Sequence, residues 1–143
     1  MALDKKDLAI IDILKTDARL SIRDIAKKTG IRPSTVHQRI TNLKKAGVIE
    51  KFTIKLNNAA IGEDFIVFMM IKTKPNVLLD NKTISNKHVK EVLGVTGEYD
   101  LLLKLKFKDV AEFNDFVIKF RKEQQVVTTL TMVATANIKE ELS

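Results

Sequence analysis

The sequence contains no cysteine and no tryptophan, and it has only two histidines, His37 and His88. The lack of cysteine excludes disulfides, thiolate metal sites and a thiol nucleophile, and two histidines are too few for a convincing zinc site. We therefore expect no metal site and no bound cofactor. A chain without cysteine also suits a reducing compartment, so we expect it in the cytoplasm.

Long hydrophobic runs are also absent. The apolar stretch at residues 65–71 is far shorter than the roughly 18 residues of a membrane span, and the opening "MALDKKDLAI" is a helix start rather than a signal peptide. Paired carboxylates, metal clusters and a nucleophile with a partner base are missing as well. We predict a soluble protein with no membrane partner and no catalytic residue.

Positive charge is plentiful, but only in the first part of the chain. Residues 1–60 hold 13 Lys and Arg against 6 Asp and Glu, whereas residues 61–143 hold 12 of each. A uniformly lysine-rich surface would not leave the second part neutral. The asymmetry indicates a module that binds a polyanion, joined to a module with another task.

Two short helices are predicted at the start of the basic part. Asp4 is placed to cap the first helix. Its expected buried stripe consists of Leu8, Ile11 and Leu14. Ser21, followed three residues later by Asp24, resembles a capping box and opens the second helix, which ends at Gly30.

A third helix follows in "PSTVHQRITNLKKAG", from Pro33 to the stop signal at Gly47. Its apolar members Val36, Ile40 and Leu43 recur at helical spacing and should face the first two helices. Helices joined by a short turn that contains glycine are typical of the helix-turn-helix motif. In that motif the last helix enters the DNA major groove.

The polar face of the third helix is therefore the candidate DNA-binding surface. Gln38 is the best candidate for direct base readout, because a carboxamide can donate to and accept from the adenine edge. The other candidate base or phosphate contacts are Ser34, Thr35, His37 and Thr41. The candidate phosphate anchors are Arg32, Arg39, Lys44 and Lys45. The alternative, a merely solvated helix face, is weakened by ten basic and two acidic residues between positions 19 and 55.

After this helix the pattern changes to a period of two. Phe52, Ile54 and Leu56 alternate with polar residues, which predicts a strand, and turn residues at 57–62 indicate a linker. We place a helix-turn-helix domain at residues 1–50, a strand and linker at 51–63, and a second domain at 64–143.

The second domain is predicted to follow a βαββαβ order. Its expected strands are residues 65–71, 89–95, 100–107 and 126–136. Apolar residues spaced three and four apart mark a helix around Val110–Phe120, whereas residues 75–87 form the weakest, partly irregular element. This order gives an antiparallel sheet with both helices on one face, the ferredoxin-like arrangement, so the whole chain belongs to the α+β class.

Four stretches in order resemble the Lrp/AsnC family of leucine-responsive and asparagine-responsive transcriptional regulators. They are "LDKKDLAIIDILKTDARLSIRDIAKKTGI", "STVHQRITNLKKAGVIEKF", "VTGEYDLLLKL" and "TTLTMV". The resemblance covers nearly the whole length. It implies a winged helix-turn-helix domain, then an amino-acid-sensing RAM domain, homodimers that close through their sheets, and assembly to octamers in many relatives.

The resemblance also implies an effector site between neighbouring RAM domains. The residues that correspond to it here are Gly97, Glu98, Tyr99, Asp100, Thr129 and Thr131. Gly97 would leave backbone N–H groups open to an α-carboxylate, and Asp100 could pair with an α-ammonium group. The alternative is an ordinary turn whose glycine and aspartate serve only the backbone.

Two features depart from the family pattern. Arg32 stands where relatives commonly place a serine cap, and the polar "NKTISNKH" is less regular than the usual first RAM helix. The sequence thus predicts a sequence-specific regulator that binds double-stranded DNA and responds to an amino acid. The alternative is an architectural protein that compacts DNA and senses nothing.

Overall fold

The computed structural model describes residues 1–123 and 126–142, and it divides the chain into two compact units, Met1–Lys55 together with the C-terminal residues from Glu141 onward, and Leu56–Glu140. We call these unit 1 and unit 2. Ser143, the last residue of the predicted second domain, lies outside the described residues. Within the described part, every helix is too short or too polar to pass through a membrane.

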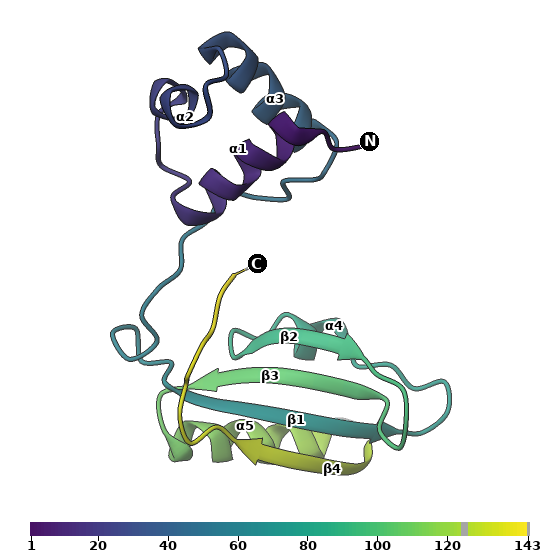
Figure 1. Cartoon of the computed structure of the whole chain (residues 1–143). Helices are drawn as coiled ribbons and strands as arrows, with labels where there is room; N and C mark the ends of the chain where they lie inside the picture. Colours follow the sequence, from purple (N-terminus) through teal and green to yellow (C-terminus); the bar gives the residue numbers. More distant parts are fainter. Residues whose placement is uncertain (124–125, 143) are drawn as a thin grey trace. The chain divides into compact units, whose positions relative to one another are not determined.

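Unit 1 contains three helices, α1 (Lys5–Thr16), α2 (Ile22–Thr29) and α3 (Pro33–Lys45), shown in Figure 1. Local chemistry explains their starts. Asp4 caps α1 in a reciprocal box with Asp7, and the Ser21 side chain accepts a hydrogen bond from the Asp24 N–H at the start of α2. Arg32 occupies the cap position of α3 without a side-chain cap bond, as the sequence predicted.

Two glycines end helices in the left-handed conformation that suits them. Gly30 terminates α2 with φ of 74°. Gly47, with φ of 75°, follows α3, where the N–H groups of Gly47 and Val48 bond back to the Lys44 and Leu43 carbonyl oxygens. These bonds form a Schellman motif, which satisfies carbonyls that the helix end would otherwise leave unpaired.

The core of unit 1 corrects the predicted stripe of α1. Ile10 is fully buried, and it packs with Ile25, Ala26, Ile31 and Val36. Of the predicted stripe, the half-buried Leu14 packs against this cluster, whereas Leu8 is 49% exposed and Ile11 is only half-buried. The stripe of α3 is as predicted, with Val36 and Leu43 buried and Ile40 half-buried.

The strand predicted at Phe52–Leu56 is not formed: the segment has no regular secondary structure. Phe52, Ile54 and Leu56 are each at least half exposed. A strand needs a hydrogen-bonding neighbour, and the four strands of the one sheet lie elsewhere, so the prediction was wrong for this chain taken alone.

Unit 2 has the predicted βαββαβ order (Figure 1). Its elements are β1 (Phe65–Thr73), α4 (Asn81–Ile84), β2 (Val89–Gly94), β3 (Leu101–Phe107), α5 (Val110–Glu123) and β4 (Val126–Val133). The strands form one antiparallel sheet in the order β2-β3-β1-β4. The ferredoxin-like fold is confirmed, and the weak 75–87 region contains only the single turn α4.

The core of unit 2 lies between the sheet and its helices. Alternate residues of β1 and β3 point into it and are buried, and they meet Leu79 near α4 and Phe116 and Phe120 of α5. These strand residues are Val67, Met69, Ile71, Leu103, Leu105 and Phe107. Because side chains alternate along a strand, the residues between them lie on the opposite side of the sheet, which we call the open face.

Candidate functional site

The predicted DNA-contacting residues are gathered on one side of α3. Ser34, His37, Gln38 and Thr41 are exposed, and Thr35 is half-buried. The apolar stripe on the other side fixes which face of α3 is turned to solvent. This arrangement presents several hydrogen-bonding side chains on a single helix surface.

Local hydrogen bonds arrange two of these polar side chains. The Gln38 Nε2 donates to Asn42 Oδ1 at 3.0 Å, and Thr41 Oγ1 donates to the His37 carbonyl oxygen at 3.0 Å. Gln38 therefore keeps its carbonyl oxygen and one N–H available. The sequence reading missed Asn42, although its position four residues after Gln38 places it on the same exposed face.

The basic residues at the two ends of α3 differ in their surroundings. Arg32 and Lys45 are exposed and make no side-chain hydrogen bond or ion pair with other described residues. Lys44 is also exposed, but its Nζ donates to the Glu50 carbonyl oxygen beyond the helix end. Arg32 and Lys45 are thus the cations most available to an external anion.

Arg39 is turned toward α1. Its guanidinium forms ion pairs with Asp4 and with Asp7, the latter at 3.1 Å between Nη1 and Oδ1. The Asp7 side chain is only 3% exposed, so its charge needs an internal partner. The predicted phosphate anchor Arg39 is therefore engaged inside unit 1, and neither aspartate was foreseen as its partner.

The predicted effector residues lie on two parts of unit 2. Gly97, Glu98, Tyr99 and Asp100 form the connection between β2 and β3, and Gly97 has φ of 111°. Asp100 is exposed, and its Oδ2 accepts hydrogen bonds from the Thr73 N–H at 2.8 Å and hydroxyl at 3.3 Å. One carboxylate oxygen thus anchors the end of β1.

The predicted threonines lie across β1 from that connection. Thr129 pairs with Ile71 and Thr131 with Met69, while Ile71 pairs on its other side with Leu101, the residue after Asp100. Thr129 is half-buried and Thr131 is exposed on the edge strand β4. The fold brings the loop and Thr129 to the same end of the sheet, but one chain alone leaves most of these residues open to solvent.

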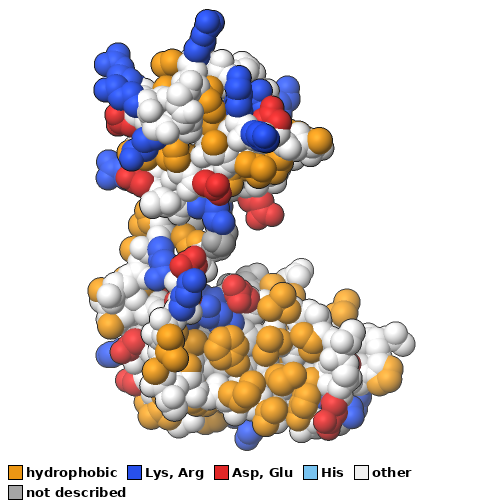
Figure 2. Space-filling model, in the orientation of Figure 1, with side chains coloured by type: hydrophobic (Ala, Val, Ile, Leu, Met, Phe, Trp, Pro, Cys, Tyr) orange, Lys and Arg blue, Asp and Glu red, His pale blue; other side chains and the backbone are white. Residues whose placement is uncertain are grey.

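The open face of the sheet carries a broad apolar surface, visible over unit 2 in Figure 2. The strand register places its members side by side on all four strands. They are Phe68, Met70, Leu93, Leu102, Leu130 and Met132. Leu93, Leu130 and Met132 are each more than 40% exposed, which is a large apolar area for water to cover.

Two lysines on the open face share one acidic partner within unit 2. Glu140 forms ion pairs with Lys104 and, at 2.9 Å, with Lys106, and it accepts a hydrogen bond from Asn58 at 3.0 Å. The hydrogen bonds from Lys104 and Asn58 hold the pKa of Glu140 well below its usual range. This cluster, which the sequence reading did not find, offsets one of the two lysine charges on the open face.

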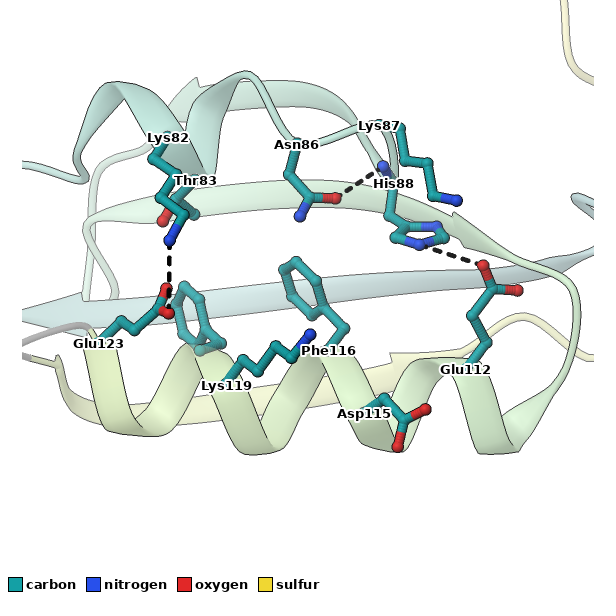
Figure 3. A pocket seen from close by; sticks show the side chains of 11 residues that line it. Lys82, Thr83, Asn86, Lys87, His88, Glu112, Asp115, Phe116, Lys119 and Glu123 are labelled. Carbon is teal, nitrogen blue, oxygen red and sulfur yellow. Dashed lines mark hydrogen bonds and ion pairs between the residues drawn. The ribbon is translucent and has the colours of Figure 1, made fainter.

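A cavity of about 430 Å³ lies on the helical side of unit 2, between α4 and α5 (Figure 3). Three lysines and three acidic residues line it, so its charges balance. His88 Nε2 lies 3.1 Å from Glu112, and Lys82 pairs with Glu123 at 3.7 Å. The predicted effector residues are not part of this wall. In the described part of the chain, no cluster of acidic residues and histidines could hold a metal ion.

Comparison with protein families gives two matches that together span most of the chain. Residues 3–50 match the winged helix-turn-helix DNA-binding model, and residues 66–143 match the Lrp/AsnC ligand binding domain. A curated relative, the HTH-type transcriptional regulator FL11 of Pyrococcus furiosus, is 36% identical over 140 residues, covering 96% of this chain and 93% of the relative.

Solved structures with this fold cover almost the whole chain. The structure of E. coli AsnC is 26% identical with a TM-score of 0.87, and the match covers 99% of this chain and 97% of AsnC. The regulator NMB0573 from Neisseria meningitidis, solved as a complex with L-Met, is 21% identical with a TM-score of 0.88, covering 99% and 96%. The second likeness concerns the fold alone.

Proposed function

The chain belongs to the Lrp/AsnC family of transcriptional regulators, and from this membership we propose that it binds specific operator DNA as a homodimer whose affinity an amino acid adjusts. It is a regulator with a helix-turn-helix DNA-binding domain and a ligand-binding domain, and its relatives are regulators rather than enzymes. We assign DNA binding to residues 1–50, a connecting segment to 51–63 and ligand binding to 64–143. We also propose a cytoplasmic location, since a DNA-binding regulator acts where the chromosome lies.

The exposed polar face of α3 is the observation that carries the DNA-binding proposal. Gln38 and Asn42 are linked to each other on this face, so each carboxamide is partly oriented before DNA arrives. A bidentate contact from glutamine to adenine requires such an orientation. Arg32 and Lys45 supply positive charge near the two ends of the helix, where phosphate contacts would fix its register.

The test is a comparison of Gln38→Ala with Lys45→Ala on operators that differ by single base pairs. Gln38→Ala should reduce discrimination at one base pair by about 1–3 kcal/mol. Lys45→Ala should weaken all sequences alike and flatten the salt dependence by about one phosphate contact. Unchanged single-base preferences in a folded Gln38→Ala protein would remove Gln38 from base readout.

The open face of the sheet supports the homodimer. A second copy offers an identical apolar surface, and a two-fold axis would bring the same residues together from both chains. Glu140 offsets one of the two positive charges of Lys104 and Lys106, which reduces the repulsion between two such faces when they pair. Two α3 helices related by this axis would contact half-sites about 34–36 Å apart, or a multiple of that spacing.

The connection between β2 and β3 supports an amino-acid effector. Gly97 has a positive φ of 111°, which suits glycine, and Asp100 has one carboxylate oxygen left after it accepts from Thr73. An α-amino acid offers both a carboxylate and an ammonium group to such a loop. The L-Met complex of the Neisseria regulator makes methionine a sensible first compound to test.

Isothermal titration with a panel of amino acids separates this proposal from the architectural alternative. A sensor should bind at least one of them, and that compound should change operator affinity or assembly by its differential affinity for the two states. The absence of any response would favour a protein that compacts DNA without a ligand.

A further inference from the structure

Arg39 occupies an unusual place on the recognition helix. It lies beside the buried stripe of α3, three residues after Val36 and one before Ile40, and its side chain is 27% exposed. Its Nη1 contacts carboxylates of both Asp4 and Asp7. The guanidinium therefore bridges the recognition helix and the first turn of α1.

The two aspartates are themselves held rigidly. The Asp7 N–H donates to Asp4 Oδ1 at 2.9 Å, and the Asp4 N–H donates to Asp7 Oδ2 at 3.1 Å, which is the capping box of α1. Each carboxylate thus accepts from the α1 backbone with one oxygen and contacts Arg39 with its other oxygen. Reciprocal bonds of this kind fix the side-chain rotamers, so the acceptor for Arg39 is preorganised.

The electrostatics agree with this geometry. Asp7 and Thr83 are the two buried polar residues of the described chain, and a buried carboxylate without a cation would be strongly unfavourable. The hydrogen bond from Arg39, followed by that from the Asp7 backbone, lowers the pKa of Asp4 to about 2. Arg39 is therefore paired in the folded unit before any DNA is present.

We propose that Arg39 is a positioning residue for DNA recognition: it locks α3 onto the capping box of α1 and so sets the orientation of the Gln38 face. This inference rests on the proposed function. A helix rotated by a small angle about its axis would still present charge to DNA, but Gln38 would meet a base edge at the wrong angle. Arg39 thus governs specificity without touching a base.

A phosphate anchor and a positioning residue differ in salt dependence. Loss of one phosphate contact should reduce the magnitude of the negative slope of log Kobs against log[salt] by about 0.9, and it should weaken binding to operator and to random DNA equally. We expect Arg39→Met to leave that slope unchanged and to reduce discrimination between the operator and its single-base variants at least about tenfold. Lys45→Met is the matched control, since it should lower the slope and keep discrimination.

Asp7→Asn sharpens the test because it removes a negative charge. Simple electrostatics predicts that this variant binds the polyanion more tightly, whereas the positioning role of Arg39 predicts the same loss of discrimination as Arg39→Met. The double variant should then be no worse than either single variant, because both remove one interaction. Arg39→Lys keeps the positive charge and should retain part of the discrimination that Arg39→Met loses. If Arg39→Met does not fold, Arg39→Lys is the variant that is compared with wild type.

Binding is measured with the full-length protein over a salt series, with circular dichroism as the check on folding. A shallower salt slope with intact discrimination in Arg39→Met, or tighter binding with intact discrimination in Asp7→Asn, would overturn the positioning role of Arg39. Failure of the wild-type protein to prefer any operator would contradict the proposed function instead. Even then, the slopes of Arg39→Met and Arg39→Lys decide whether Arg39 contacts phosphate.

Discussion

The two units leave opposite kinds of surface exposed once their cores are filled. On unit 1 the exposed side of α3 is polar, with basic residues near its ends, whereas the open face of unit 2 is apolar across four strands. A polar, basic helix face matches a polyanion, and an apolar sheet face matches another protein surface. The comparison fits the proposal that each chain carries its own base-reading helix, while unit 2 pairs with a second copy.

The largest effect should come from the core of unit 2, and it tests whether the two units fold separately. Phe107 is fully buried between β3 and α5, and Phe107→Ala should cost about 3–5 kcal/mol of unfolding free energy. Because the cores share no buried residue, α1 to α3 should stay folded. Hydrogen exchange measures the protection of both units separately. Ile118→Ala is the control, because the Ile118 side chain is 55% exposed. Loss of protection in α1 to α3 would mean one cooperative unit.

The next effect concerns the open face. Met132 on the edge strand β4 pairs with Phe68 of β1 and is 45% exposed, so Met132→Asp would place a charge within the proposed dimer surface. Burial of an unpaired carboxylate should raise the dimer dissociation constant at least about 100-fold. Analytical ultracentrifugation measures it, and Ile118→Asp on the helical side is the control. Equal dissociation constants for the two variants would place the interface elsewhere.

The ligand site should show an intermediate effect. Asp100→Asn removes the charge proposed to hold an ammonium group and keeps an oxygen that can accept from the Thr73 N–H. Loss of a charge-assisted hydrogen bond should weaken the effector about 10- to 100-fold, or about 1.5–3 kcal/mol. Titration calorimetry compares it with Thr73→Val, which removes only the hydroxyl contact. A similar loss in both variants would make Asp100 a support of the β1 end alone.

The smallest effect is a pH dependence confined to unit 1. The pKa of Asp4 lies at about 2 in the folded unit, below its ordinary value of 3.8, so the ion pair stabilises the fold above 3.8 and this contribution is lost as the pH falls toward 2. Acid unfolding of wild type should therefore be steeper in this window than that of Arg39→Met. Parallel pH profiles would show that Arg39 does not lower the pKa of Asp4.

Local sequence signals predicted most of the elements. The caps at Asp4 and Ser21, the stops at Gly30 and Gly47 and the alternation of β3 depend on nearby residues, so they could be read directly. The buried side of α1 could not, because apolar residues surround that helix and packing against α2 and α3 decided the outcome. The strand prediction at residues 52–56 was wrong because an alternating pattern does not show which strand would hydrogen-bond to it.

The candidate site divides in the same way. The exposed face of α3 followed from helical periodicity alone. The destination of Arg39 did not, since its partners lie 35 and 32 residues earlier in the chain. The effector residues came from the family likeness, and the fold gathers only part of them at one end of the sheet. Ion pairs and contacts between residues far apart in the chain could not be predicted from the local sequence pattern.

The most direct test of the account measures the affinity of full-length protein for a selected operator and for random DNA at one fixed salt concentration, with and without each amino acid. A specific, ligand-responsive regulator should prefer the operator by at least about 10³-fold. One amino acid should then change operator affinity by at least about fivefold. Equal affinity for both DNAs, unmoved by every amino acid, would contradict the account and leave an architectural DNA-binding protein.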